Sequence, residues 1–179
     1  MNFQVQVTGI QETLQAIKSV KQAYQTTTIG KIRELIERLM YEGYEIAAVG
    51  FSEALYAGTK DVALDPPTWR GETMVLSASG ESVAFIEFGT GTVYEEYPDA
   101  DILQKAGVKP RGQYGKKKGK NPPWVYIGEA GDIGYQIATK SDGRGVIRTY
   151  GNPPARAMYN ASRVFNQDHV VEVAREVFR

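Results

Sequence analysis

Apolar and small side chains recur every three or four positions between residues 32 and 50, and charged side chains occupy the positions between them. This spacing is typical of an amphipathic helix, because residues three and four apart lie on one helix face. We therefore expect a long helix from residue 31 to about residue 56, with Thr28 placed to cap its start. The expected buried stripe consists of Ile32, Leu35, Ile36, Leu39, Gly43, Ile46, Ala47 and Gly50.

The pattern has a different period before this helix. Phe3, Val5 and Val7 alternate with polar residues, which predicts a half-buried strand that ends at Gly9. Apolar residues then return to helical spacing, which predicts a short helix between about residues 11 and 22.

Extended segments are expected after Asp65-Pro66-Pro67, because proline lacks an amide donor and pushes the preceding residue toward extended backbone. Runs of β-branched and aromatic residues separated by short turns predict antiparallel hairpins. The expected strands cover residues 73–78 and 82–88 in a first hairpin, 135–139 and 146–150 in a second, and 124–128 beside it. The sequence thus predicts an α+β fold, with a mostly antiparallel sheet of five or six strands packed with the long helix and a C-terminal helix.

The C-terminal helical region has a clear start signal at Asn152-Pro153-Pro154. Asparagine is a good cap and proline suits the first helical position, so we expect the helix to begin there. Two alternatives remain open near residues 166–168: the helix runs through, or it breaks and Asp168 caps a last segment. The apolar or small positions at helical spacing are Met158, Ser162, Phe165, Val170, Val173, Ala174 and Val177.

Residues 92–123 show no periodicity, and their charges separate into an acidic part followed by a basic part. Glycines and prolines interrupt the basic part, and apolar residues are too few for a core. We expect a mobile charged loop that acts as an interaction arm within a single domain spanning residues 1–179, with one helical turn near residues 100–106. The loop residues assigned to interaction are Glu95, Glu96, Asp99, Asp101, Lys105, Lys109, Arg111, Lys116, Lys117, Lys118 and Lys120.

The charge pattern supports two hypotheses about partners. Acidic and basic loops of neighbouring copies can attract each other head to tail, which predicts a ring that loosens when salt is added. Alternatively, the basic run and the nearby rings of Tyr114, Trp124 and Tyr126 bind nucleic acid.

Composition narrows the classes of protein. The chain has 179 residues, with 21 basic and 21 acidic side chains, so its formal net charge is 0 and gives no global attraction to nucleic acid or anionic lipid. It contains 0 cysteines, which excludes disulfides and thiolate metal sites. The sequence shows neither a secretory signal nor a long apolar stretch, so we expect a soluble protein made in the cytoplasm.

Candidate catalytic groups are few. His169 is the one imidazole, and the sequence shows no convergent nucleophile or carboxylate for it. Glu87 lies among apolar residues, so a general base is conceivable, but the favoured interpretation is a carboxylate that accepts hydrogen bonds and holds a turn. Gly89-Thr90-Gly91 lacks the lysine and spacing of a phosphate loop. We therefore expect no catalytic site, no cofactor and no metal, and keep a small hydrolase as the weaker alternative.

The most informative segment is 83–91, where an apolar run that favours a strand carries Glu87-Phe88 into an abrupt Gly89-Thr90-Gly91 stop. Together with the run from Gly151 to Met158, which contains Asn152-Pro153-Pro154, this segment resembles the head-tail connection proteins of tailed bacteriophages, the neck and tail-completion family. In this chain Ala157-Met158 stands where that family more usually has Pro-Phe.

The resemblance implies a non-enzymatic virion protein that is made in the host cytoplasm and is located in the neck or tail. It implies a homo-oligomeric ring with two kinds of partner: a connector or head-closure protein on one side, and a tail-tube or tail-terminator protein on the other. DNA would pass through the lumen of such a ring.

Overall fold

The computed structural model describes residues 2–5, 28–91, 97–107 and 123–179. The chain forms two compact units whose segments alternate along the sequence. Unit 1 combines Met1–Phe3, Val49–Ala63 and Ser79–Ala157, and unit 2 combines Gln4–Ala48, Leu64–Ala78 and Met158–Arg179. The single domain expected from the sequence stays a prediction.

The long helix is present as α2, Thr28–Glu53, a span of 26 residues. It begins and ends three residues earlier than expected, and Thr28 is its first residue. Leu35 and Leu39 of the expected stripe are fully buried, as is Ala47. The amphipathic pattern thus located the helix and most of its core-facing side. Ile46 of the expected stripe is wrong, because it is 37% exposed, and Met40, which was not expected there, is buried.

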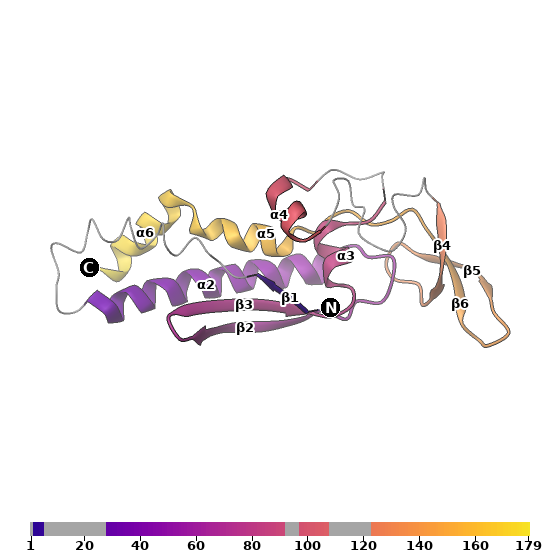
Figure 1. Cartoon of the computed structure of the whole chain (residues 1–179), viewed down its shortest axis with the longest axis horizontal. Helices are drawn as coiled ribbons and strands as arrows, with labels where there is room; N and C mark the ends of the chain where they lie inside the picture. The colour runs from indigo at the N-terminus through magenta and orange to yellow at the C-terminus, as the bar shows by residue number, and fades with distance from the viewer. Residues whose placement is uncertain (1, 6–27, 92–96, 108–122) are drawn as a thin grey trace. The chain divides into compact units, whose positions relative to one another are not determined.

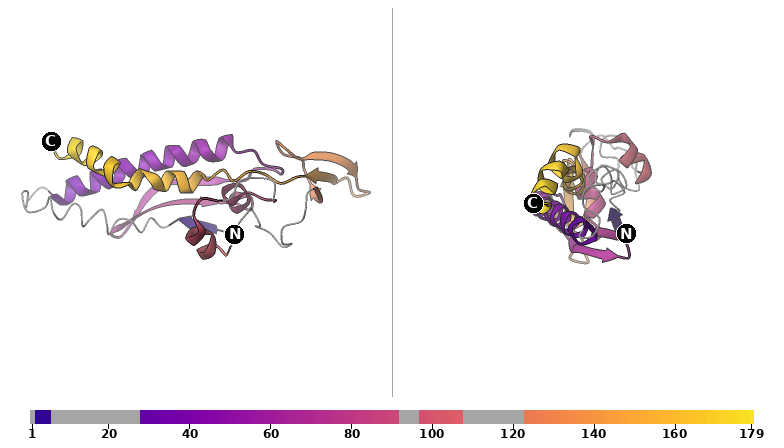
Figure 2. Two further views of the ribbon diagram at one scale, coloured as in Figure 1. Left: turned by 90° about the horizontal axis from the view of Figure 1, so that it is seen from above. Right: turned by 90° about the vertical axis from the view of Figure 1, so that its left-hand side faces the viewer.

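In unit 2, α2 packs against the C-terminal segment, which consists of α5 (Ala157–Ser162), the 3₁₀ turn η1 (Arg163–Phe165) and α6 (Gln167–Val177). This segment runs back along α2 in the opposite direction (Figures 1 and 2). The shared core consists of Leu35, Leu39, Val164, Val170 and Val177.

The start of the C-terminal helix differs from the prediction. Asn152 and Pro153 lie outside any helix, and α5 begins only at Ala157 because Asn152 is used in another contact, described below. The open question near residue 166 is resolved in favour of a break. Asn166 caps α6 by accepting a hydrogen bond from the His169 amide at 3.0 Å, so the cap is Asn166 and not Asp168.

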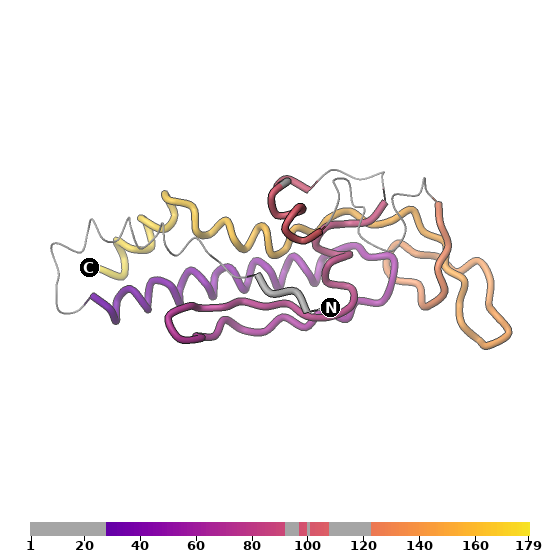
Figure 3. The backbone as a smooth tube through the Cα atoms, viewed as in Figure 1, coloured from indigo at the N-terminus to yellow at the C-terminus, as the bar shows by residue number. Residues whose placement is uncertain are grey.

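The first sheet has the order β1-β3-β2, formed by β1 (Asn2–Val5), β2 (Ala63–Arg70) and β3 (Thr73–Ser79). β1 overlaps the start of the predicted N-terminal strand, whereas the helix expected at residues 11–22 lies outside the described residues. The tube in Figure 3 follows hairpin β2–β3 along α2. β3 is the central strand and is buried at five of its seven positions, from Met74 to Ala78.

The partner of β3 was predicted wrongly. Its hairpin partner is β2 and not residues 82–88, and Asp65-Pro66-Pro67 lies inside β2. Proline is tolerated there because β2 is an edge strand, where a missing amide donor need not break a ladder.

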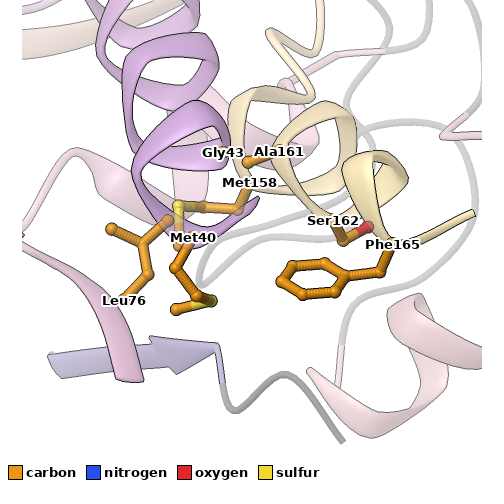
Figure 4. A pocket seen from close by; sticks show the side chains of 7 residues that line it. All are labelled: Met40, Gly43, Leu76, Met158, Ala161, Ser162 and Phe165. Atoms are coloured by element: carbon orange, nitrogen blue, oxygen red, sulfur yellow. The ribbon is translucent and has the colours of Figure 1, made fainter. Parts of the chain in front are cut away.

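Side chains of unit 2 join hairpin β2–β3 to helix α2. Trp69 donates a hydrogen bond from Nε1 to Glu37 Oε1 at 2.7 Å, and the Arg33 guanidinium lies 5.0 Å from the centre of the Trp69 ring. A cavity of about 10 Å³ remains between α2, β3 and the C-terminal helices (Figure 4). It is lined by Met40, Gly43, Leu76, Met158, Ala161, Ser162 and Phe165. Its volume leaves room for about one water molecule, so it is no ligand site.

The second sheet belongs to unit 1 and has the order β4-β6-β5, with β4 (Trp124–Gly128), β5 (Tyr135–Thr139) and β6 (Gly145–Thr149). Both pairings are antiparallel, with Trp124 opposite Thr149 and Tyr135 opposite Arg148. These strands match the predicted ones within one residue. The prediction of one continuous sheet is wrong, because the described strands form two three-stranded sheets.

Two short helices complete unit 1. Residues 83–88 form helix α3 (Val83–Phe88), so the predicted strand there is wrong. Asp61 fixes the backbone before this helix by accepting hydrogen bonds from the amides of Glu81 and Ser82 at 2.7 and 2.8 Å. Helix α4 (Ala100–Lys105) confirms the predicted turn within the charged loop.

Candidate functional site

The two segments that carry the resemblance lie against each other in unit 1. Thr90 donates its amide to the Asn152 carbonyl at 2.9 Å, and Asn152 donates its amide to the Thr90 carbonyl at 3.1 Å. They form an isolated antiparallel bridge between residues 62 positions apart in the sequence. The Gly-Thr-Gly turn and the Asn-Pro-Pro turn are therefore parts of one structural feature, which we call the turn junction (residues 85–91 and 149–156).

Side chains reinforce this bridge in the interior. The Thr90 hydroxyl donates to Asn152 Oδ1 at 2.5 Å and accepts from the Asn152 amide at 3.1 Å. The Asn152 side-chain amide donates to the Phe85 carbonyl at 2.9 Å. Asn152 is fully buried, so these polar groups need each other because water does not reach them.

The junction also completes the C-terminal end of helix α3. The last carbonyls of a helix have no partner within it. Here the Ile86 carbonyl accepts from the Ala155 amide at 2.8 Å, and the Glu87 carbonyl accepts from the Arg156 amide at 3.2 Å. Residues 152–156, which were expected to start a helix, instead satisfy the end of another one.

Glycine is required where the junction is tightest. Gly89 has φ 73° and ψ 171°, a conformation open essentially to glycine alone. A Cβ atom at Gly89 would also lie 2.7 Å from the Pro154 nitrogen. At Gly151, with φ 95°, a Cβ atom would lie 2.0 Å from the Thr90 carbonyl oxygen. The sequence prediction of a special turn at residues 89–91 is thus confirmed, although it ends a helix rather than a strand.

The ring of Trp124 from β4 covers the junction. Its Cη2 atom lies 2.9 Å from the position that a Cβ of Gly151 would occupy and 3.1 Å from that of Gly91. The aromatic ring therefore depends on small residues in both turns. The sequence pattern predicts a strand and a stacking surface at Trp124, but it does not connect this residue with either turn.

Glu87 is buried in helix α3, with 1% of its surface exposed. The Tyr97 hydroxyl donates to Glu87 Oε1 at 2.7 Å, and the Tyr97 ring lies 5.0 Å from that of Phe88, centre to centre. The carboxylate thus accepts a hydrogen bond and helps to hold this region, as favoured from the sequence. The donor was not predicted, because Tyr97 is separated from the motif by a segment with no readable pattern.

His169 lies in the first turn of α6 in unit 2. Its Nε2 atom is 2.8 Å from Glu42 Oε2 on α2, and its Nδ1 atom is 3.9 Å from Glu172 Oε2. This contact joins two helices that already share a core. His169 is partly exposed, and Asn166 caps its amide, so these contacts fit a structural role.

The charged loop is described only in part. Asp99 caps α4 by accepting from the amides of Asp101 and Ile102 at 2.9 and 3.0 Å, and Lys105 is the last residue of that helix. The other residues assigned to the interaction loop lie outside the described residues: Glu95, Glu96, Lys109, Arg111, Lys116, Lys117, Lys118 and Lys120. Their assignment stays a prediction.

Two features are absent from the described residues. These residues contain no group of three or more histidine, aspartate or glutamate residues placed to hold a metal ion. In the same part of the chain, no helix has the length and apolar character needed to cross a membrane.

Comparisons of this chain with models of protein families, with curated proteins and with solved structures find no match. The resemblance to the phage neck family therefore depends on residues 85–91 and 151–158 and on the helical N-terminal third of the chain.

Proposed function

We propose that this protein is a structural component of a tailed-phage virion, a neck or tail-completion protein that joins the head connector to the tail. It acts by docking onto copies of itself as a ring and onto connector and tail proteins, without catalysis. The observation that carries the proposal is the bridge between Thr90 and Asn152, since it unites the two segments that resemble the family.

The turn junction suits a docking protein because it is rigid. Buried hydrogen bonds between distant segments hold the chain in one arrangement, and a rigid surface loses little conformational entropy when it binds. The polar groups at its centre are hydrogen-bonded to one another, so they stabilise the fold. Partner proteins would bind to the surrounding surface.

The alternatives from the sequence gain no support from the described residues. The basic loop of the nucleic-acid hypothesis lies outside them, apart from Lys105 at its start. For a hydrolase, Glu87 is buried and hydrogen-bonded to Tyr97, and the described cavity belongs to unit 2 and is apolar.

Electron microscopy tests the proposal directly. The purified protein is imaged alone and after mixing with tail-less phage heads or with isolated tails. We expect rings, or an added density at the head vertex or the end of the tail. If the protein attaches to neither preparation and forms no ring, the proposal fails.

A matched variant makes this test specific. Asn152→Ala removes the side-chain hydrogen bonds of Asn152 in the junction, whereas Asn160→Ala makes the same change at an exposed position of α5. We expect attachment to be reduced by the first substitution and retained by the second. Equal attachment of both variants would show that attachment does not depend on the turn junction.

A further inference from the structure

The sheet of unit 1 exposes large apolar side chains on its two edge strands. Val125 and Ile127 of β4 are 50% and 47% exposed, and Tyr135 and Ile137 of β5 are 45% and 49% exposed. Ile147 on the central strand β6 is fully buried. The exposed apolar side chains therefore lie on β4 and β5, the two strands beside which a further strand could pair.

The register places three of these side chains on one face. Val125 and Tyr135 both pair with Arg148, and Ile127 pairs with Val146. Side chains of directly paired residues lie on the same face of a sheet. Val125, Ile127 and Tyr135 therefore share the face opposite to Ile147.

Both edges of this sheet are open within the described part of the chain, where β4 and β5 each pair with β6 alone. Every residue of β5 is exposed. An open edge presents backbone donors and acceptors that another strand can use. Because both strands are antiparallel to β6, β4 and β5 run in the same direction.

Charges of opposite sign follow the two edge strands. Glu129 comes directly after β4, and Lys140 comes directly after β5, and both are exposed. Glu129 Oε2 accepts a hydrogen bond from the Thr59 hydroxyl at 3.2 Å, and a carboxylate has capacity for more donors. If β5 of one copy lay parallel to β4 of another, Lys140 would therefore lie beside Glu129.

We propose that β5 of one copy pairs in parallel with β4 of the next copy, so that the sheets of neighbouring subunits become continuous. The pairing brings Tyr135 beside Val125 of the neighbour. The extra residue in the bulge between Gln136 and Ala138 then brings Lys140, and not Thr139, beside Glu129 of the neighbour. The contact is head to tail and repeats from copy to copy, which closes into a ring where the rotation allows. It deepens the proposed function by naming the contact between subunits, and rests on it only for the closed ring.

A two-fold contact between two β5 strands fits these observations less well. It would leave Val125 and Ile127 uncovered. Antiparallel strands would place each Lys140 at the start of the neighbouring β5, where the preceding acid in the chain, Asp132, is already paired with Lys60 at 3.0 Å. A bulge between Gln136 and Ala138 also shortens the backbone ladder that β5 offers. The apolar and charged side chains must therefore contribute, and they have complementary neighbours only in the head-to-tail pairing.

Cysteine cross-linking tests the pairing, because the chain contains 0 cysteines of its own. Neighbouring strands lie about 4.8 Å apart, within the range that a disulfide spans. Proteins carrying Glu129→Cys and Lys140→Cys are mixed at high concentration under mild oxidation. We expect disulfide-linked dimers from the mixture, few from either variant alone, and a ladder of multimers from the double variant.

The controls define failure. Glu81→Cys replaces another exposed acid of unit 1, and its mixture with Lys140→Cys should give no more dimer than either protein alone. The proposal is overturned if the Glu129 mixture does not exceed this control. It is also overturned if Ile137→Cys alone dimerises as efficiently as the Glu129 mixture, since that outcome indicates the two-fold contact.

The pairing of β5 with β4, which we call the joint, and the phage function are two proposals that can fail separately. Rings or attached densities without the Glu129–Lys140 cross-link would overturn the joint and keep the phage function. Cross-linked multimers that attach to neither heads nor tails would keep the joint and overturn the phage function. Charge reversal adds a second readout: Glu129→Lys alone should weaken self-association in sedimentation experiments, and adding Lys140→Glu should restore it.

Discussion

Asn152 connects its own turn with two other parts of unit 1, through its side chain and its backbone. It bonds to Thr90 in the Gly-Thr-Gly turn and to the Phe85 carbonyl in helix α3, and it is fully buried. A buried polar group that loses its partner costs more than an exposed one, because water cannot replace the lost bond. The energetic weight of the turn junction therefore depends strongly on this residue.

We predict that Asn152→Ala lowers the free energy of unfolding by about 1–3 kcal/mol, since it leaves the Thr90 hydroxyl and the Phe85 carbonyl without this partner. Urea unfolding followed by circular dichroism measures the change. Asn160→Ala is the control, and we expect it to change stability by less than about 0.5 kcal/mol. Equal stability of the two variants would contradict the importance of the junction.

The sequence identified the important residues of the junction but not their tasks. Gly89, Thr90 and Asn152 were recognisable because glycine and asparagine allow backbone conformations and hydrogen bonds that other residues avoid. Their pairing was not recognisable, since 62 positions separate Thr90 from Asn152 and neither local pattern refers to the other. Tyr97 was missed for the same reason, because only the fold brings its hydroxyl to Glu87.

At the scale of elements, α3 shows how distant contacts override local preference. Its sequence, Val-Ala-Phe-Ile-Glu-Phe, favours a strand, and a helix of six residues is marginal alone. Asp61 organises the backbone before its first residue, and residues 152–156 satisfy the carbonyls at its end. Both helix ends are thus stabilised by segments far away in the sequence, and the local sequence of α3 does not predict these contacts.

The role of Asp61 makes a prediction about pH. Hydrogen bonds from the Ser82 hydroxyl, and then from the Ser82 and Glu81 amides, hold the pKa of Asp61 below its ordinary value. A lowered pKa in the folded state means that the charged form contributes stability above the ordinary carboxyl pKa, and that this contribution is lost as pH falls through the lowered value. We expect Asp61→Asn to be less stable than the wild type at pH 7.

The same linkage provides the control within one experiment. Once Asp61 is protonated, its carboxyl group resembles the amide of the variant in charge. The difference in unfolding free energy between the two proteins should therefore shrink as the pH falls from the ordinary carboxyl range downward. Denaturant titrations at a series of pH values measure this difference. A gap that stays constant over the acid range would show that the charge on Asp61 does not stabilise the fold.

Elements with strong local patterns were predicted well. Helix α2 and strands β4, β5 and β6 lie within a few residues of their predicted bounds, because periodicity and turn residues determine them locally. Strand β2 was missed, since Asp65-Pro66-Pro67 indicates an interruption in any central strand. Its place at the edge of the first sheet, which permits proline, is a property of the fold.

The packing of α6 allows a test with neighbouring residues of one type. Val170 is 4% exposed and contributes to the core with Leu35 and Leu39, whereas Val171 is 37% exposed. We predict that Val170→Ala lowers the unfolding free energy by about 2 kcal/mol through lost burial and the cavity it leaves. Val171→Ala should change stability by less than about 0.5 kcal/mol, because alanine also favours helix. Chemical denaturation compares the two, and a larger loss at Val171 would contradict the assigned helix face.

At the scale of the molecule, the chain alternates between its two compact units. Helix α2 supplies residues to both units, since Ala48 belongs to unit 2 and Val49 to unit 1. Contiguous patterns reveal elements but not such an arrangement, because each unit is assembled from separate stretches. The sequence prediction of a single sheet was wrong for this reason, since strands of similar character belong to different sheets.

Assembly of the whole molecule is the property on which the two proposed contacts make different predictions. The head-to-tail contact between sheets depends on one ion pair and on apolar edges, whereas the acidic and basic loops would attract each other through many charges. Exposed charge interactions are screened by salt, and burial of apolar surface is not. The salt dependence of self-association therefore reports how much the loops contribute.

We predict that replacing Lys116, Lys117 and Lys118 by glutamine weakens self-association about three- to 150-fold at low salt, since each lysine contributes about 0.2–1 kcal/mol. The loss should disappear at about 0.5 M salt, where the Debye length is short. Sedimentation velocity at the two salt concentrations measures it. The control replaces three exposed arginines by glutamine, which removes the same charge elsewhere: Arg38, Arg70 and Arg175. Equal weakening by both triple variants would mean that net charge, and not the basic loop, governs assembly.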